Sequence, residues 1–253
     1  MLKVENLSKW FGGLRAVDGC SFTVRPGTIT GLIGPNGAGK TTVFNLLTGF
    51  LRPDAGKVLL EGEDITALPP HRVFHKGIAR TFQIPREFKE MTVIENLMLV
   101  PPGQWGERLF DPFLRPWQVA RQEREIGKQA SEVLEFLGLS KLRDEPAGSL
   151  SGGNQQKVLL ARWLHRQAGV IIFDEPTRGI DVGARHEIYQ LMNSLVAKGC
   201  AIIMVTSELP EALGMSDRIL VMHEGRLTGE VEDVTGATQE DLMALAIGRD
   251  SAA

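Results

Sequence analysis

The sequence has few of the features that mark secreted, membrane-spanning or metal-binding chains. Its 253 residues include two cysteines, Cys20 and Cys200, which form neither a C-x-x-C pair nor a metal-ligand spacing. We expect both to be buried free thiols in a reducing cytosol. No apolar run reaches the ~18 residues that a bilayer-spanning helix needs. The first residues, Met1 to Leu7, alternate like a strand and lack the apolar core of a signal peptide.

A large charge of either sign is also missing. The net charge of -3 gives no reason to expect nucleic acid or an anionic membrane surface as a partner. Charged runs such as residues 121–125 mix both signs and predict a solvated helix face. His71 and His75 are spaced to share a helix face, but no third ligand is in sight, so we expect no metal site there. What remains is an ordinary globular composition, 43% apolar and 23% charged.

The most specific motif is the eight-residue stretch from Gly34 to Thr41, which fits G-x-x-x-x-G-K-[ST]. Its glycines allow positive φ and a close approach of the backbone to phosphates, on which successive N–H groups converge. Lys40 supplies a charge for the β and γ phosphates, and the Thr41 hydroxyl is placed to ligate Mg²⁺. The apolar run before the loop predicts a strand, and residues 42–49 predict a helix. This strand, loop and helix setting favours a nucleotide site over a glycine-rich surface turn.

An acidic pair follows a second buried strand. Residues 170–173 are a continuous apolar run, which is typical of a central parallel strand, and Asp174 and Glu175 follow directly. A carboxylate at the carboxyl end of such a strand lies where a Mg²⁺ ligand is needed, so we assign Asp174 to the metal. Glu175 would polarise the attacking water. The alternative is a solvated acidic pair at a strand end.

A second small-residue stretch precedes an apolar helix. Ser151, Gly152 and Gly153 lie between Leu150 and a helical pattern that runs to Leu164. A hydroxyl, two glycine backbones and a helix N-terminus form an anion site, although such a stretch alone is usually a capped loop. Since the chain already has one phosphate site, this distant stretch suggests a site for the nucleotide of another subunit.

The rest of the chain predicts an α/β fold with a helical insertion. The first ~35 residues read as an antiparallel strand layer. The middle third is helical, with apolar positions at helical spacing from Trp117 to Leu137. Strand and helix alternation resumes after Leu150, with strands at 170–173 and 201–206, a helix at 182–195, a hairpin at 218–231 and a capping box at 238–241.

Taken in order, these motifs resemble those of ATP-binding cassette (ABC) ATPases over nearly the whole chain. The matching segments are the loop 34–41, Gln83 in Ala79 to Gln83, the signature Leu150 to Gln155, the acidic pair 174–175 and the D-loop Gly179 to Asp181. The resemblance implies an α/β P-loop NTPase (RecA-like) core with an antiparallel β subdomain and an inserted α-helical subdomain. It places the core at 1–88 and 155–253 and the helical subdomain at 89–154 in one ABC ATPase domain.

The resemblance also implies roles for individual residues around ATP and Mg²⁺. Phe11 would stack on adenine, with Val17 beside the base. Thr41, Gln83 and Asp174 would lie at the metal, and Glu175, Lys40, Gln83 and Ser207 would act in hydrolysis. Ser151 and Gly153 would contact the γ-phosphate held by the opposite subunit of a head-to-tail dimer. The residues around the phosphates would be Asn36, Gly37, Ala38, Gly39, Lys40, Thr41 and Thr42.

The implied partners are a second ABC ATPase subunit, transmembrane permease subunits and, indirectly, a solute-binding protein, with no nucleic acid. The implied place is the cytoplasmic face of the cell (inner) membrane, held peripherally. Residues 11–17, 77–83 and 91–97 are similar to branched-chain amino acid importer ATPases, whereas 151–157, 174–184 and 207–211 are similar to monosaccharide importer ATPases. We favour the amino-acid type, because the Gln83 region and the helical subdomain meet the membrane subunits in this family.

Other readings stay open beside the importer. The chain could be a non-transport ABC ATPase of DNA repair or translation, or a regulatory module that uses ATP only to dimerise. A stand-alone P-loop kinase is disfavoured, because it leaves Leu150 to Gln155 without a role. Ser207 departs from the family, which usually has a histidine there against the γ-phosphate. Serine neither carries a proton near neutral pH nor reaches as far, so we expect a slow site on this chain's own loop and a faster one on a partner subunit.

Overall fold

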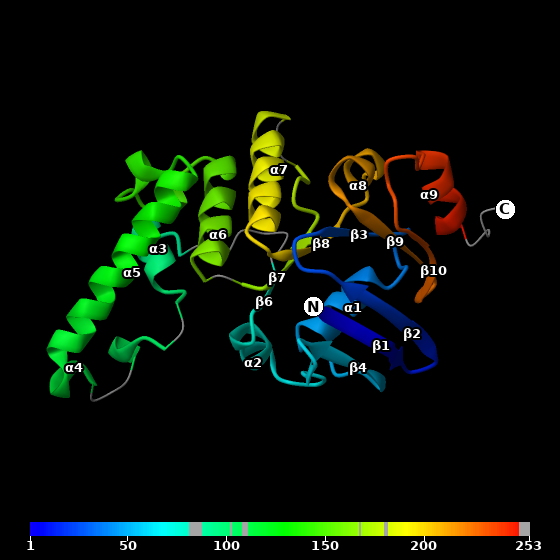
Figure 1. The fold of residues 1–253 in the computed structure, drawn as a ribbon, viewed down its shortest axis with the longest axis horizontal. Coiled ribbons are helices and arrows are strands. Elements are labelled where there is room, and N and C mark those ends of the chain that lie inside the picture. Colours follow the sequence, from blue (N-terminus) through cyan, green and yellow to red (C-terminus); the bar gives the residue numbers. More distant parts are fainter. Residues whose placement is uncertain (81–87, 102, 108–110, 167, 180–181, 248–253) are drawn as a thin grey trace. The chain divides into compact units, whose positions relative to one another are not determined.

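The computed structural model describes residues 1–80, 88–101, 103–107, 111–166, 168–179 and 182–247. The chain divides into two compact units (Figure 1). The first holds Met1–Gln83, Gly169–Gly179 and Arg185–Ala253, and the second holds Ile84–Ala168 and Ile180–Ala184. The predicted core at 1–88 and 155–253 has other boundaries than the first unit, and it stays a prediction. Each unit is described by itself.

A six-stranded sheet forms the centre of the first unit, in the order β10-β9-β3-β8-β7-β6. β9, β3, β8, β7 and β6 run parallel, and β10 is antiparallel to β9. Every residue of β3, β7 and β8 is buried, which explains why these strands are short continuous apolar runs in the sequence. The strands are β3 (Ile29–Ile33), β6 (Ile78–Arg80), β7 (Val170–Asp174), β8 (Ala201–Val205), β9 (Arg218–His223) and β10 (Arg226–Val231).

A second, antiparallel sheet has the order β2-β1-β4-β5. Its strands are β1 (Leu2–Phe11), β2 (Leu14–Val24), β4 (Ala55–Leu60) and β5 (Glu63–Asp64). β1 lies between β2 and β4, with Leu2 opposite Val24 on one side and Leu60 on the other. One hydrophobic core joins residues of both sheets to α1 (Lys40–Leu47), whose Phe44 is fully buried. This shared core therefore holds β1 and β2 against α1, the helix that follows the phosphate-loop motif.

The remaining helices of the first unit are α2 (Pro70–His75), α8 (Leu209–Met215), α9 (Gln239–Ala246) and, from Arg185 on, α7 (Val182–Ala197). α9 begins at the predicted capping box, in which the Thr238 hydroxyl accepts from the Asp241 N–H and the Asp241 carboxylate accepts from the Thr238 N–H. α8 and α9 pack beside β9 on their own small core.

The described part of the second unit is helical. α3 (Val93–Met98), α5 (Pro116–Phe136) and α6 (Gly152–Arg166) share a core that includes Leu97, Leu134 and Val158. α4 (Asp111–Leu114) and the short 3₁₀ segments at Trp105–Glu107, Ser140–Leu142 and Ala147–Ser149 complete it. α5 ends before Gly138, whose φ of 68° fits the predicted glycine cap. Among the described residues, no helix combines the length and apolar character needed to cross a bilayer.

The structure confirms the predicted α/β class, the hairpin of β9 and β10, and the helices around 42–49, 117–137 and 182–195. The sequence did not reveal β5, α2, β6 or α3, which have two to six residues each. His71 and His75 both lie exposed on α2, and no cluster of metal-ligating side chains occurs among the described residues. The two cysteines are buried and free, as expected.

Candidate functional site

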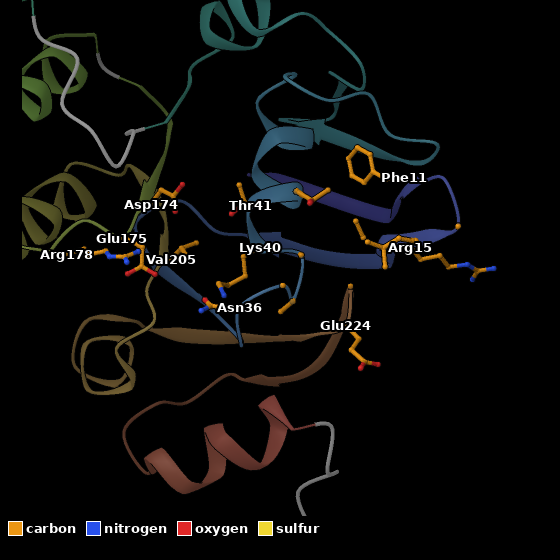
Figure 2. A pocket seen from close by; sticks show the side chains of 18 residues that line it. Phe11, Arg15, Asn36, Lys40, Thr41, Asp174, Glu175, Arg178, Val205 and Glu224 are labelled. Carbon is orange, nitrogen blue, oxygen red and sulfur yellow. The ribbon is translucent and has the colours of Figure 1, made fainter.

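A cavity of about 840 Å³ opens in the first unit where β3 and β7 end. Figure 2 shows Lys40 and Asn36 near the carboxylate of Glu175, with Phe11 on the other side of the cavity. A volume of this order suits a nucleotide-sized ligand. Its walls are Phe11, Gly13, Leu14, Arg15, Ala16, Asn36, Gly37, Ala38, Gly39, Lys40, Thr41, Thr42, Asp174, Glu175, Arg178, Val205, Glu224 and Gly225.

Two glycines of the loop are required by close backbone contacts. Gly34 has φ 152°, and a Cβ there would lie 2.2 Å from the carbonyl oxygen of Met222. Gly39 has φ 103°, and its Cβ would lie 2.4 Å from the carbonyl oxygen of Ala16. Gly39 is also the residue before α1, so the left-handed turn aims the N-terminus of α1 at the cavity. The loop therefore places backbone N–H groups beside a positive helix end, which is the setting for a phosphate.

Lys40 is folded over its own loop. Its Nζ donates to the carbonyl oxygens of Gly34 at 2.6 Å and Pro35 at 3.0 Å. Burial lowers the pKa of Lys40, and the carboxylates of Glu175 and Asp174 oppose that shift. The ammonium group is thus held at the cavity wall by two neutral acceptors, which a phosphate oxygen can replace.

Asp174, the last residue of β7, is held by a buried arginine. The Nη2 of Arg80, at the end of β6, donates to Asp174 Oδ2 at 2.8 Å, and the two side chains are 10% and 7% exposed. Its Nη1 donates to Asn45 Oδ1 at 2.6 Å, and the guanidinium lies 5.6 Å from the ring centre of Phe44. Arg80 therefore fixes one carboxylate oxygen of the predicted Mg²⁺ ligand from the neighbouring strand.

Glu175 has an unusual backbone and a short hydrogen bond. Its φ of 52° is in the left-handed region, which is costly for a residue with a side chain, by about 1–3 kcal/mol. Its N–H donates to the carbonyl of Val205 at 3.0 Å, and the Ser207 hydroxyl donates to Glu175 Oε1 at 2.5 Å. Both contacts come from β8 and the residues just after it. Together they hold the carboxylate of Glu175 at the wall of the cavity.

A buried carboxylate links the segment after Glu175 to two helices. Glu211 on α8 is 5% exposed and accepts from the Thr177 hydroxyl at 2.7 Å and from the Tyr189 hydroxyl at 3.0 Å. Burial, followed by the charge of Glu211, raises the pKa of Tyr189 to about 12, so its hydroxyl stays a donor. Because Ser207 lies just ahead of α8, this cluster fixes both sides of the hydrogen bond between Ser207 and Glu175.

The other end of the cavity is built from β1, β2 and the turn between β9 and β10. Phe11 is 48% exposed, and the Lys9 ammonium lies 5.6 Å from its ring centre. Glu224 and Gly225 form the two-residue turn with φ of 44° and 80°, as a type I′ hairpin requires. An exposed aromatic ring at this wall offers a flat face to a base.

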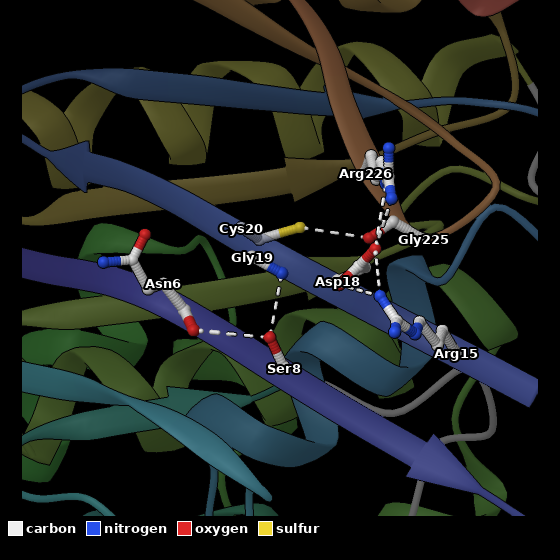
Figure 3. A network of polar contacts seen from close by, with 8 residues as sticks. All are labelled: Asn6, Ser8, Arg15, Asp18, Gly19, Cys20, Gly225 and Arg226. Carbon is white, nitrogen blue, oxygen red and sulfur yellow. Dashed lines mark hydrogen bonds and ion pairs between the residues drawn. The ribbon is translucent and has the colours of Figure 1, made fainter.

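An ion cluster ties that turn to β2 (Figure 3). Asp18 on β2 accepts from Arg226 at 2.6 Å and 2.9 Å and from Arg15 at 3.3 Å, and these arginines lower its pKa. The Gly225 carbonyl accepts from the Asp18 N–H at 2.8 Å and from the Cys20 thiol at 3.3 Å. The turn is therefore fixed beside Arg15, which lines the cavity.

The structure brings most predicted residues together. Phe11, the loop residues from Asn36 to Thr42, Asp174 and Glu175 all line the one cavity, and Ser207 reaches Glu175. Val17 does not line it: the inward alternation of β2 places this side chain in the core, with no exposed surface. Its contact with a base stays a prediction. Gln83 lies outside the described residues.

The predicted anion stretch lies in the second unit. Ser151 is exposed and directly precedes α6, whose first residues include Gly153. The Ser151 carbonyl accepts from the Gln155 N–H at 2.9 Å, so α6 starts there as predicted. The role of both residues toward a partner's nucleotide stays a prediction.

The donor set at the loop end of the cavity fits Mg²⁺. The Thr41 hydroxyl and the Asp174 and Glu175 carboxylates are all oxygen donors on the same wall. Mg²⁺ is usually held by one or two carboxylates together with substrate phosphates and water. On this wall Arg80 donates to Oδ2 of Asp174.

Several residues of the site were not predicted from the sequence. Arg80, Glu211 and the Asp18 cluster act through partners that lie 94, 34 and 208 residues away, which no local pattern reveals. Arg15 and Arg178 line the cavity and lie in segments 11–17 and 174–184, but the sequence assigned neither a role in the site. Arg80 carried one signal: it is a charged residue directly after the apolar pair Ile78 and Ala79.

A glycine loop between the parallel strand β3 and the helix α1, with an acidic residue ending β7 of the same sheet, defines a P-loop nucleotide-binding fold. The chain matches the family described as ABC transporter over residues 17–178. It belongs to this family of ABC transporter ATP-binding domains, whose members are ATPases.

Two relatives carry names that refer to different solutes. The chain is 42% identical over 236 residues to a probable branched-chain amino acid transport ATP-binding protein LivG of Archaeoglobus fulgidus, covering 92% of this chain and 91% of the relative. It is 38% identical over 253 residues to the ribose import ATP-binding protein RbsA of Oceanobacillus iheyensis, covering 98% of this chain and 48% of the relative. The chain thus spans about half the length of that ribose relative.

Solved structures agree with the fold. The ADP conformation of MJ1267, an ATP-binding cassette of an ABC transporter, is 37% identical with a TM-score of 0.78, covering 98% of this chain and 94% of that one. The dimeric structure of MJ0796, a bacterial ABC transporter cassette, is 25% identical with a TM-score of 0.74, covering 94% of this chain and 100% of that one.

Proposed function

We propose that this chain is the ATP-binding and hydrolysing subunit of an ABC importer for branched-chain amino acids or related small polar solutes. The observation that carries the proposal is one cavity lined by the phosphate loop, Asp174 and Glu175. The solute class is supported by the LivG relative, which is matched over 91% of its length. We place the subunit peripherally at the cytoplasmic face of the cell membrane, against permease subunits.

The geometry suggests how the residues would act. The loop N–H groups and Lys40 would bind the β and γ phosphates, and Phe11 would stack on adenine. Glu175, held by the Ser207 hydroxyl, would orient and polarise the attacking water. Thr41 and Asp174 would hold Mg²⁺, whose charge would offset the negative charge that develops on the phosphates. The other residues of the cavity would hold these groups and the nucleotide in position.

We infer further that the working site is composite. Ser151 and Gly153 lie in the second unit, outside the cavity walls, and would complete the nucleotide site of a second cassette in a head-to-tail dimer. The dimeric cassette MJ0796 supports such an assembly for the fold. The partner is a second copy of this chain or a different cassette.

A Glu175→Gln variant tests the assignment of the water-activating group. We expect it to bind MgATP like the parent and to lose turnover by a factor of about 10²–10⁴, because the amide cannot accept the proton. The same change at Glu123, an exposed position of α5, should leave turnover unchanged. Turnover that survives Glu175→Gln would refute the assignment.

Ser207 offers a second test. We propose that the chain's own site hydrolyses ATP slowly because Ser207 orients Glu175 but cannot reach the γ-phosphate as an imidazole does. Ser207→His should raise turnover in the assembled transporter, and Ser207→Ala, which removes the hydrogen bond to Glu175, should lower it. No gain with histidine would contradict the slow-site proposal.

The monosaccharide importer remains the second candidate, because the ribose relative covers 98% of this chain. Uptake of labelled leucine and labelled ribose by cells expressing the chain with its permease subunits separates the two. Uptake of leucine alone supports the amino-acid importer, and uptake of ribose alone favours the alternative.

A further inference from the structure

Three large apolar side chains of α4 and the start of α5 are exposed. Figure 1 shows that α4 leads into the start of α5. Phe113 is 85% exposed, Leu114 75% and Trp117 86%. Single exposed apolar residues are normal, but an exposed cluster usually marks an interaction site. We call these three residues the wedge.

The segment that precedes the wedge is fixed to α5. The Gln122 side chain accepts from the Trp105 N–H at 2.7 Å and donates to the Gly103 carbonyl at 3.2 Å. The Arg115 guanidinium lies 5.1 Å from the ring centre of Trp105. Gln104 donates to the Met98 carbonyl at 2.7 Å. Residues 103–105 are therefore held against the first turns of α5, which carries Trp117.

A row of cations continues from the wedge along α5. Arg121, Arg124 and Lys128 follow Trp117 at spacings of four, three and four residues, which places all four on one helix face, over about 16 Å. The opposite face is buried, through Val119, Ile126, Ala130 and Leu134. We call the three cations the stripe.

None of the stripe cations forms an ion pair with a carboxylate among the described residues. Glu125 lies on the flank, where its Oε1 accepts from Gln129 at 3.3 Å. The helix therefore sorts the run 121–125, mixed in sign along the sequence, into a basic face and acidic flanks. The excess of positive charge is confined to residues 115–128, because Glu132 and Glu135 follow Lys128 on the same helix at spacings of four and three residues.

We propose that the wedge and the stripe form a docking surface for an anionic lipid bilayer. Tryptophan and phenylalanine favour the interface between headgroups and acyl chains, where the wedge would insert. Unpaired arginine and lysine side chains are attracted by acidic headgroups, and the stripe would lie along them. The charge complementarity of three cations that have no ion pair among the described residues, beside an apolar tip, favours lipid over a protein partner. The surface lies in the second unit and shares no residue with the cavity walls.

Co-sedimentation of the full chain with vesicles tests this proposal. We expect binding to vesicles of phosphatidylcholine with phosphatidylglycerol and little binding to phosphatidylcholine alone, with loss at high salt. The double variant Phe113→Ala with Trp117→Ala should weaken binding about tenfold or more. The triple variant Arg121→Gln, Arg124→Gln and Lys128→Gln should remove the preference for acidic lipid.

A matched control removes two exposed apolar side chains elsewhere. Met243→Ala with Ile247→Ala, at and just after α9, should leave vesicle binding unchanged. All variants should keep the parent's MgATP affinity and thermal unfolding, since the changed side chains are exposed. Absence of vesicle binding, or equal loss in the control pair, would overturn the lipid proposal. Absence of vesicle binding with wedge-dependent capture of the permease subunits would instead identify a protein-docking surface.

Discussion

At the level of single residues, the buried ion pair of Arg80 and Asp174 places a permanent positive charge beside the proposed Mg²⁺ ligand. Arg80→Met would remove the guanidinium that pairs with the buried Asp174 carboxylate. Breaking such a pair from one side costs about 3–5 kcal/mol. We therefore expect the free energy of unfolding in urea to fall by about that amount.

The matched control is Arg115→Met, which removes an exposed guanidinium that stacks on Trp105. This variant should lower the free energy of unfolding by about 1 kcal/mol or less. A loss for Arg80→Met no larger than for Arg115→Met would mean that Asp174 is not held by Arg80 in solution. Arg80→Lys keeps the charge but cannot bridge both Asp174 and Asn45. Its loss of unfolding free energy should therefore lie between the losses for Arg80→Met and Arg115→Met.

The two thiols give a second prediction at this scale. Burial raises the pKa of both Cys20 and Cys200 to about 11. Thiolate is the reactive form, so neither residue should react with a thiol reagent in the folded protein near neutral pH. Both should react in denaturant. Rapid labelling of the native chain would show that one of the two sites is open.

Single residues also show the limit of sequence reasoning. The loop 34–41 and the acidic pair 174–175 could be recognised because their chemistry lies in adjacent residues. The left-handed φ of Glu175 and its hydrogen bond to Ser207 could not, because β8 reaches Glu175 only through the parallel pairing of β7 and β8. The sequence predicted that Val17 contacts the base, but the alternation of β2 places its side chain in the core.

At the level of elements, the capping boxes of α3 and α9 are the simplest local stabilisers. Thr238→Ala removes the hydroxyl that accepts from the Asp241 N–H, and we expect a loss of about 1 kcal/mol in the free energy of unfolding. Denaturant unfolding measures it. Ser140→Ala, at a segment start without a side-chain cap, should change stability less.

Asp241 makes the same box depend on pH. Hydrogen bonds from Thr238 hold the pKa of Asp241 below its ordinary 3.8. Because the folded pKa lies below the unfolded one, Asp241 stabilises the fold above about pH 3.8, and this contribution is lost as the pH falls through the depressed value. Unfolding of the parent and of Asp241→Asn, followed from neutral pH into acid, should converge at low pH. A constant difference would contradict the assignment.

Helices and strands were predicted correctly where the apolar pattern was long or was bounded by clear turn residues. Buried runs gave β3, β7 and β8, and the apolar period gave α5. β5 and β6, of two and three residues, have no period of their own and form only because longer strands offer edges to pair with. α3 follows the N-cap Thr92, which forms a capping box with Glu95 that the sequence contains and that could have been recognised.

At the level of the whole molecule, the α/β class and the family follow from the order of the motifs, because each motif predicts its neighbours. The pairing of Arg80 with Asp174, of Glu211 with Thr177 and of Asp18 with Arg226 follows only from the folded topology. The proposed composite site goes one step further, since its second half lies on another chain. That assembly is the central claim of the account.

A mixing experiment tests this claim most directly. Lys40→Met disables the loop and keeps the signature stretch, and Ser151→Arg does the reverse. In a head-to-tail dimer, the loop of the second variant and the signature of the first rebuild one intact site. We predict that each variant alone is inactive and that an equimolar mixture recovers MgATP turnover that rises with protein concentration. A mixture as inactive as its parts would contradict a composite site built from two copies of this chain, and full turnover by Ser151→Arg alone would contradict a composite site with either partner.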